Sequence, residues 1–147
     1  MALTFEKLEV YKLAEQLADF AWTVVSRWDR FSKDTIGKQL VRAADGIGAN
    51  IAEGFGRGSF NDNKRFVKIA RGSLYETRHW LRRAYRRKLL QDEDVRSLRP
   101  LLDQLSPRLN AYLRAIGIQQ TRGTATASRT AKGQMTKDKG QRTRSNA

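Results

Sequence analysis

The sequence predicts an all-α protein, an antiparallel up-down-up-down four-helix bundle followed by a disordered basic C-terminal tail. Apolar residues recur at steps of three and four along residues 10–116, which is the period of helices with one buried face. No alternating run is long enough to predict a strand. Residues 121–147 contain no Leu, Ile, Val, Phe, Tyr or Trp, so burial of apolar surface cannot offset their loss of chain entropy on folding.

The first predicted helix covers residues 10–28, and its apolar stripe continues over five turns from Val10 to Trp28. Trp22 lies off this stripe, beside polar residues. We therefore expect Trp22 at a contact between subunits rather than in the core.

The second predicted helix covers residues 36–51, with Ser32 or Asp34 as its N-cap and Gly54 as its C-terminal stop. Its small residues are unusual, because glycine in a helix interior costs about 1 kcal/mol relative to alanine. Gly46 and Gly48 therefore predict a close approach of a neighbouring backbone. A frayed and poorly specified helix is the alternative.

The third predicted helix has its apolar stripe along residues 66–85, and either Ser59 or Asn61 is placed to cap its start. The stripe of the fourth covers residues 95–116, with Asp92 as the expected cap. Two prolines, Pro100 and Pro107, fall inside this fourth helix, so we expect a kink or a short break there.

Short connections between the four helices predict that each helix packs antiparallel to the next one along the chain. We divide the chain into a bundle of residues 1–118 and a disordered basic tail of residues 119–147.

The chain has 29 Lys and Arg residues against 15 Asp and Glu, a formal net charge of +14. The tail alone has seven bases and one acid, so the body is basic in its own right. A field of this sign attracts phosphate backbones, acidic proteins or anionic lipid.

The composition offers few of the residue types that enzymes commonly use for catalysis. The chain has no cysteine and a single histidine, His79, which argues against disulfides, thiolate chemistry and metal sites built from Cys or His. It has no apolar leader and no run long enough to span a bilayer. We expect a cytoplasmic protein that is not an enzyme, uses no cofactor or metal and does not partner a membrane.

The third predicted helix is strongly basic. Residues 57–88 contain eleven bases and two acids. Six of the bases are spaced so that they share one side of a helix over about 33 Å, which is the electrostatic footprint of a nucleic-acid partner. The residues predicted to bind nucleic acid are Arg71, Arg78, Arg82, Arg83, Arg86, Arg87 and Lys88.

Aromatic side chains interleave with these bases. His79, Trp80 and Tyr85 offer surfaces on which unpaired bases can stack. The alternative is a solvated charged face, with Trp80 and Tyr85 filling the core or an interface.

The stretch QLVRAADGIGANIAEGFGRGS, residues 39–59, is the most distinctive in the chain. Glu53 falls in the last turn of its helix, where the macrodipole disfavours an anion by about 0.3–1 kcal/mol. Arg42, Arg57 or an arginine of the third helix can offset that cost, and Asn50 lies on the adjoining face. This pattern predicts a structural polar network, and a ligand-binding or catalytic Asn50/Glu53 pair is the alternative.

Three glycines at alternate positions, Gly54, Gly56 and Gly58, precede the start of the third helix. A tight turn between helices explains them, and a phosphate cradle at the helix start is the alternative. The structural motif of this region comprises Arg42, Asn50, Glu53, Gly54, Gly56 and Arg57.

The chain resembles the four helix bundle protein family, first noticed as a reading frame in intervening sequences of 23S ribosomal RNA genes. The resemblance covers roughly residues 5–115 and departs from the family in the prolines of the fourth helix and in the basic tail. The positions that match the family pattern R-A-x-x-x-I-x-x-N-I-A-E-G-x-G-R-x-S are Arg42, Ala43, Ile47, Asn50, Ile51, Ala52, Glu53, Gly54, Gly56, Arg57 and Ser59. The segments FEKLEVYKLA and RFVKIARGSLYE also look like the family.

The resemblance implies a four-helix bundle that assembles into a ring of five with a central channel. Distant relatives include the accessory protein of diversity-generating retroelements, which binds a reverse transcriptase and nucleic acid. We therefore expect a non-catalytic homopentamer that binds nucleic acid, with RNA favoured by the ribosomal-gene context. The alternative is a protein-interaction scaffold, such as an accessory subunit of a reverse transcriptase or of a ribosome-associated complex.

Overall fold

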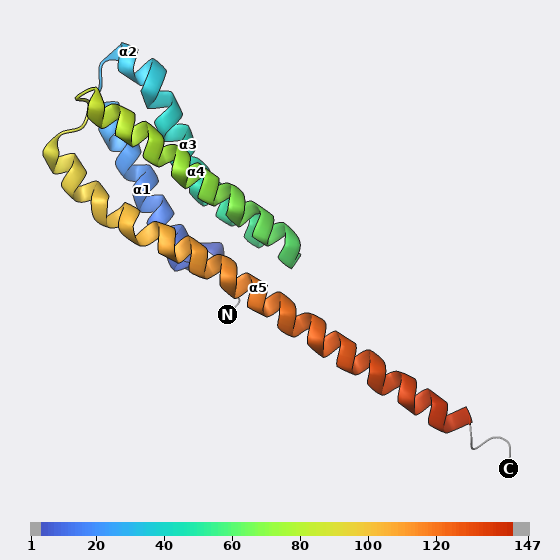
Figure 1. Cartoon of the computed structure of the whole chain (residues 1–147). Coiled ribbons are helices and arrows are strands. Elements are labelled where there is room, and N and C mark those ends of the chain that lie inside the picture. Colours follow the sequence, from blue (N-terminus) through green and yellow to red (C-terminus); the bar gives the residue numbers. More distant parts are fainter. Residues whose placement is uncertain (1–3, 143–147) are drawn as a thin grey trace.

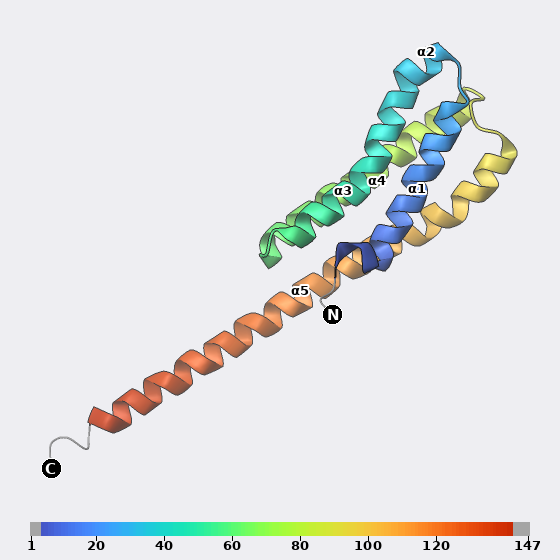
Figure 2. The ribbon, with the colours of Figure 1, turned by 180° about the vertical axis from the view of Figure 1, so that it is seen from behind.

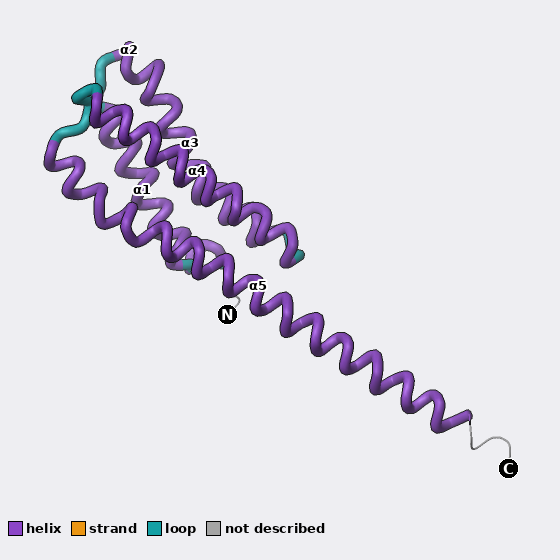
Figure 3. Tube along the Cα trace, viewed as in Figure 1, coloured by secondary structure: helices purple, strands orange, loops and turns teal. Residues whose placement is uncertain are grey.

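The computed structural model describes the backbone of residues 4–142 and the side chains of residues 4–130. Within that part of the chain four long helices form and no strand does: α1 (Glu9–Ser26), α3 (Lys38–Gly56), α4 (Phe60–Arg86) and α5 (Asp92–Arg142). A 3₁₀ turn, η1 (Phe5–Lys7), precedes α1. The short α2 (Arg30–Ser32) and a π-helical turn, η2 (Lys33–Gly37), lead into α3. Figure 3 shows how little of the trace is loop.

The ribbon runs up through α1, down through α3, up through α4 and down through α5 (Figure 1). α1 packs against α3 and α5, and α4 packs against the same two helices on the other side (Figure 2). The all-α prediction is confirmed, and the path of the chain follows the predicted up-down-up-down order.

The core lies along the axis of the bundle, where each long helix contributes its predicted apolar stripe. The side chains of Leu17, Leu40, Ile47, Leu74 and Leu105 are all less than 2% exposed. Burial of this kind of side chain contributes about 1.5–3 kcal/mol each relative to exposure, so these stripes supply the main drive for the four helices to pack.

The helical segment that leads into α3 begins earlier than predicted. Asp29 is the N-cap, because its carboxylate accepts hydrogen bonds from the Ser32 backbone N–H at 3.1 Å and from the Ser32 hydroxyl at 2.6 Å. The prediction of Ser32 or Asp34 as cap is wrong. Only the later part of this segment is buried, starting at Ile36. Because the prediction followed the apolar stripe, it placed the start of the helical segment too late in the chain.

The end of α3 also differs from the prediction. The helix continues past Gly54 to Gly56, and the turn falls at Gly58, whose φ is +78°. Gly54 is instead a packing residue, because a Cβ at this position would lie 2.8 Å from the Phe66 Cβ and 3.1 Å from the backbone oxygen of Asn63. The close approach of a neighbouring backbone was expected at Gly46 and Gly48, and there the nearest atoms belong to the side chains of Ser73 and Tyr11 instead. A neighbouring backbone comes close at Gly54, where α3 crosses α4.

The start of α4 is capped as predicted, since the Ser59 hydroxyl accepts a hydrogen bond from the Asp62 backbone N–H at 3.1 Å. At α5 the cap differs: Asp92 is the first helical residue, and Asp94 closes the turn by accepting from the Gln91 N–H at 2.9 Å. This is the reciprocal half of a capping box.

The two prolines of α5 do not break it. Pro100 and Pro107 lie inside one continuous helix, which curves over this part of its length (Figure 1). Both prolines are exposed, and between and beside them Leu98, Leu105 and Leu109 are buried. Each proline removes one backbone hydrogen bond on the solvent side, while core packing on the opposite side holds the helix together. The predicted short break is wrong, and the bend is found.

Beyond the bundle α5 continues as a helix to Arg142 and projects away from the other helices (Figure 1), where the sequence predicts a disordered tail. Among residues 4–130, Ile116 is the last that is buried, and residues 121–130 are all exposed. This exposed stretch is held by hydrogen bonds within its own helix, including those from threonine hydroxyls to carbonyls four residues earlier, and isolated helices of this kind are marginal in water. Within the described part the Gln120 side chain still donates a hydrogen bond to the Asn61 side chain at 2.8 Å, and the boundary of the bundle at residue 118 stays a prediction. Residues 143–147 of the predicted tail lie outside the described part.

Candidate nucleic-acid interface

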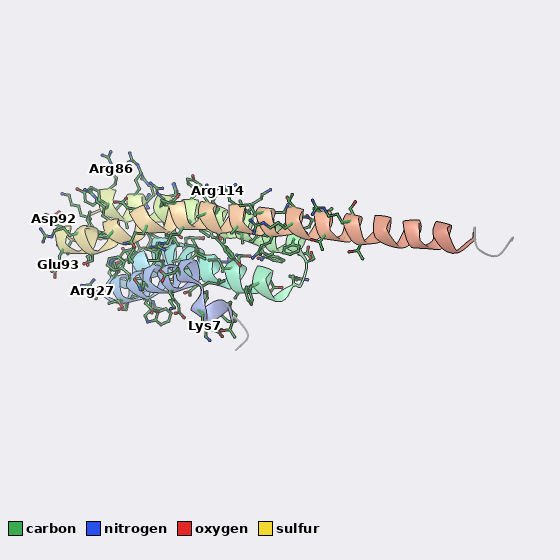
Figure 4. All side chains as sticks on the ribbon, turned by 90° about the horizontal axis from the view of Figure 1, so that it is seen from below. Lys7, Arg27, Arg86, Asp92, Glu93 and Arg114 are labelled. Atoms are coloured by element: carbon green, nitrogen blue, oxygen red, sulfur yellow. The ribbon has the colours of Figure 1, made fainter. Side chains whose placement is uncertain are left out.

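The basic face of α4 is oriented by the core stripe on its other side. Val67, Ala70, Leu74, Leu81 and Ala84 are buried against the bundle, which leaves the opposite side of a 27-residue helix in solvent. Five of the predicted nucleic-acid-binding residues are exposed there and at the end of the helix: Arg78, Arg82, Arg86, Arg87 and Lys88. Figure 4 shows Arg86 projecting away from the bundle.

None of these five basic side chains lies within ion-pair distance of a carboxylate among the described residues. Both acids of α4 are otherwise engaged. Asp62 pairs with Arg65 at 3.6 Å, and the Glu76 carboxylate accepts a hydrogen bond from the Trp80 indole N–H at 3.3 Å. The positive charge of the face is therefore not neutralised from within the fold.

Two of the seven predicted residues are less available. Arg71 is half-buried, and its guanidinium donates to the Asn110 side-chain oxygen at 3.2 Å. This contact joins α4 to α5, so Arg71 serves the packing of the bundle. Arg83 is also half-buried. Sequence spacing predicts both as nucleic-acid contacts and does not reveal that Arg71 is engaged with α5.

A groove of about 590 Å³ lies between α4 and the first part of α5. Its floor is apolar, formed in part by Leu98 and Leu102. We define the α4–α5 groove by six residues on its walls: Tyr75, Arg78, Arg82 and Tyr85 from α4, and Arg99 and Asp103 from α5.

Sequence reasoning found only part of this groove. It identified Arg78, Arg82 and Tyr85, and it missed Tyr75 and the two α5 residues. Arg99 directly follows Leu98 of the core stripe, which is the signal that could have placed it at the edge of the helix contact. His79 also lines the groove, whereas Trp80 is half-buried against the core.

The motif residues of α3 do not converge on one site. The Asn50 amide donates to the Gly46 carbonyl of its own helix at 2.7 Å. Glu53 pairs with Arg57 at 2.9 Å, and the Arg57 guanidinium lies 5.0 Å from the centre of the Phe66 ring on α4.

The remaining member of the polar motif, Arg42, lies elsewhere. It is exposed and lines a separate groove beside Trp22. Of the predicted partners of Glu53, Arg57 is the one that pairs with it, and Asn50 is not joined to this pair. The structural interpretation of the motif stays a prediction. Of the glycines, Gly54 and Gly56 belong to α3, and only Gly58 forms the turn to α4.

Neither a metal-binding cluster nor a helix that could span a membrane is found among the residues that the structure describes. No three His, Cys, Asp or Glu side chains gather there in a way that would hold a metal ion. No helix in that part of the chain is both long and apolar enough to cross a bilayer.

Comparison with known proteins relates the chain to one family. The model of the 23S rRNA-intervening sequence protein matches residues 6–111. Among solved structures, a protein of unknown function from the S23 ribosomal protein family of Bacteroides thetaiotaomicron superposes with a TM-score of 0.62 at 22% identity. The match covers 71% of this chain and 97% of that one, and it indicates a common fold. No curated protein matches the chain.

Proposed function

Because the chain belongs to the 23S rRNA-intervening sequence protein family, we propose that it is a non-catalytic nucleic-acid-binding protein of the cytoplasm that contacts phosphates through α4. The observation that supports this most directly is the set of five exposed basic side chains on α4 and its C-terminal turn, none paired with a carboxylate among the described residues. The family name favours RNA as the ligand.

The chemistry of the face suits phosphate. Arg78, Arg82 and Arg86 are spaced by four residues, so their guanidinium groups follow one line along the helix at steps of about 6 Å. The planar fork of arginine binds phosphate oxygens in pairs. Unpaired cations on a surface release condensed counterions from a nucleic acid when they bind it, and this release drives the association.

The test is a binding titration against short RNA and DNA over a salt series. Replacing Arg82 and Arg86 together by glutamine should weaken binding to all sequences. It should also flatten the slope of log K against log salt by roughly 1.5–2 units, since each phosphate contact contributes about 0.7–0.9. Deleting residues 121–147 should lower affinity further, because that segment adds seven bases and one acid.

A matched control is the Lys12→Gln/Arg30→Gln variant. It removes the same charge from exposed positions on α1 and α2 and should leave the salt slope close to that of the parent. If the Arg82→Gln/Arg86→Gln variant binds like the parent, the face is only solvated charge, and the scaffold function is the better one.

We also propose that the chain is a homo-oligomer, with five subunits expected from the family resemblance. Trp22 is 66% exposed and Phe31 is 76% exposed. Trp22 borders a groove of about 470 Å³ that is lined also by Val25 and Val41. Exposed apolar surface of this kind is typical of protein contacts, and a ring needs a second, different face to receive it.

Light scattering at several concentrations tests the assembly. The parent should have a mass several times that of one chain, and Trp22→Ser should shift the population towards monomer. A mass near the 16.8 kDa of a single chain at all concentrations would contradict self-association.

A further inference from the structure

The α4–α5 groove combines exposed aromatic rings with arginines. Tyr75 is 59% exposed and Tyr85 is 53% exposed, and neither hydroxyl makes a hydrogen bond to another described residue. Ten residues separate them on α4, so the rings stand about 15 Å apart along the helix axis. One base cannot contact both rings, and each ring is free to stack on a base of its own.

Cations flank the rings on both walls. Arg78 and Arg82 lie between the two tyrosines on α4, and Arg99 faces them from α5. Asp103 is the one carboxylate among the residues that line this groove. The three arginines therefore attract a phosphate backbone, whereas the Asp103 carboxylate repels it and suits the amino groups of bases.

We propose that the α4–α5 groove binds unpaired nucleotides of single-stranded nucleic acid, with Tyr75 and Tyr85 stacking on bases while Arg78, Arg82 and Arg99 contact phosphates. The proposal rests on the proposed function and gives its ligand class. In a duplex the faces of the bases are covered by their neighbours, so only the phosphate contacts remain available to this surface. Aromatic side chains beside a cationic track are the means by which proteins hold single strands without reading their sequence.

The experiment compares three labelled ligands with equal numbers of phosphates by fluorescence anisotropy. They are a mixed-sequence single strand of about 12 nucleotides, within the size range of single-strand sites, a blunt duplex and an abasic strand. The single strand is tested both as RNA and as DNA, which shows which of the two nucleic acids binds more tightly. The full chain is used, with the variants Tyr75→Ala/Tyr85→Ala and Tyr75→Phe/Tyr85→Phe.

We expect the parent to bind the single strand more tightly than the duplex or the abasic strand. The alanine variant should lose about 5- to 150-fold in single-strand affinity for each stacking contact removed, with no change for the abasic strand. The phenylalanine variant should bind like the parent, because it keeps both rings. Both tyrosines are exposed, so thermal melts of the variants should match that of the parent.

Two results would overturn the inference alone. One is equal affinity of the parent for single strand and duplex. The other is an alanine variant that binds the single strand like the parent, while the Arg82→Gln/Arg86→Gln variant has lost binding. That result would mean that phosphate contacts hold the strand and that base stacking does not contribute. Absence of binding to any of the ligands, in the parent and at low salt, would overturn both this inference and the proposed function.

Discussion

The Arg27 guanidinium lies 3.0 Å from the Asp94 carboxylate and joins the end of α1 to the first turn of α5, 67 residues away. The same carboxylate accepts the Gln91 backbone N–H at 2.9 Å. One side chain thus closes the first turn of α5 and fastens it to α1. The Trp28 indole N–H adds a second link by donating to the Leu89 carbonyl at 2.9 Å.

Replacing Asp94 by alanine should lower the free energy of unfolding by about 1–2 kcal/mol, because the helix cap is lost together with the contact to Arg27. Arg27→Ala should cost less than 1 kcal/mol, since the Arg27 side chain is 58% exposed and its pairing is screened by water. Chemical denaturation checks both. Asp92→Ala, in the same turn but exposed, is the control, and an equal loss there would contradict a special role for Asp94.

Gly54 and Gly72 should respond in opposite ways to replacement by alanine. At Gly54 the new Cβ would lie 2.8 Å from the Phe66 Cβ, so α3 and α4 must separate, at a cost of about 1–3 kcal/mol. At Gly72, inside α4, a Cβ meets nothing within 4 Å, and alanine should stabilise by about 0.5–1 kcal/mol. Thermal melts measure both, and stabilisation by Gly54→Ala would refute the close contact.

Lys88 occupies a backbone position that favours glycine. Its φ is +60°, and the bonds from the Lys88 N–H to the Tyr85 carbonyl and from the Leu89 N–H to the Ala84 carbonyl form a Schellman motif at the end of α4. Lys88→Gly should therefore raise stability by about 1 kcal/mol, even though a basic residue is lost. Lys88→Ala removes the same charge and keeps the Cβ, so equal melting temperatures for the two variants would contradict this explanation.

Asp29 should make stability depend on pH. Hydrogen bonds from the Ser32 hydroxyl and the Ser32 backbone N–H hold the pKa of Asp29 below its ordinary value of 3.8. A carboxyl group with a lowered pKa in the folded state stabilises the fold above its ordinary pKa, and loses this effect as the pH falls through the lower folded value. Asp29→Asn should melt below the parent at pH 7, and the difference should vanish in acid.

The control for this pH dependence is Asp19→Asn on α1. Asp19 is exposed and makes no hydrogen bond or ion pair with another described residue. A pH-independent gap between Asp29→Asn and the parent would show that charge plays no part in the cap.

Limited trypsin digestion should cut first after Arg122 and Arg129, which lie in the exposed stretch of α5 that follows Ile116. An unpacked helix opens locally at little cost, whereas the bundle must open cooperatively before it can be cut. The stable product should end near residue 122. Equally fast cleavage within α3 or α4, followed by mass spectrometry, would contradict a packed four-helix unit.

The helical class, the inner face of each long helix and the two candidates for the cap of α4, Ser59 and Asn61, follow from the sequence alone. These properties are local: a repeat of 3.6 residues records which side of a helix is buried, and a cap depends on side chains within one turn. The basic face of α4 followed from the same period, because a buried stripe containing Leu74 and Leu81 forces Arg78 and Arg82 outward.

Which residues of different helices come together depends on the tertiary fold. The contact of Arg27 with Asp94, the contact of Arg71 with Asn110 and the placing of Tyr75 and Arg99 on the walls of one groove depend on how α5 is rotated and placed against α1 and α4. Sequence periodicity shows which face of a helix is buried, but it does not show which other helix packs against that face. Side-chain packing across the whole core selects the pairing and register of the helices.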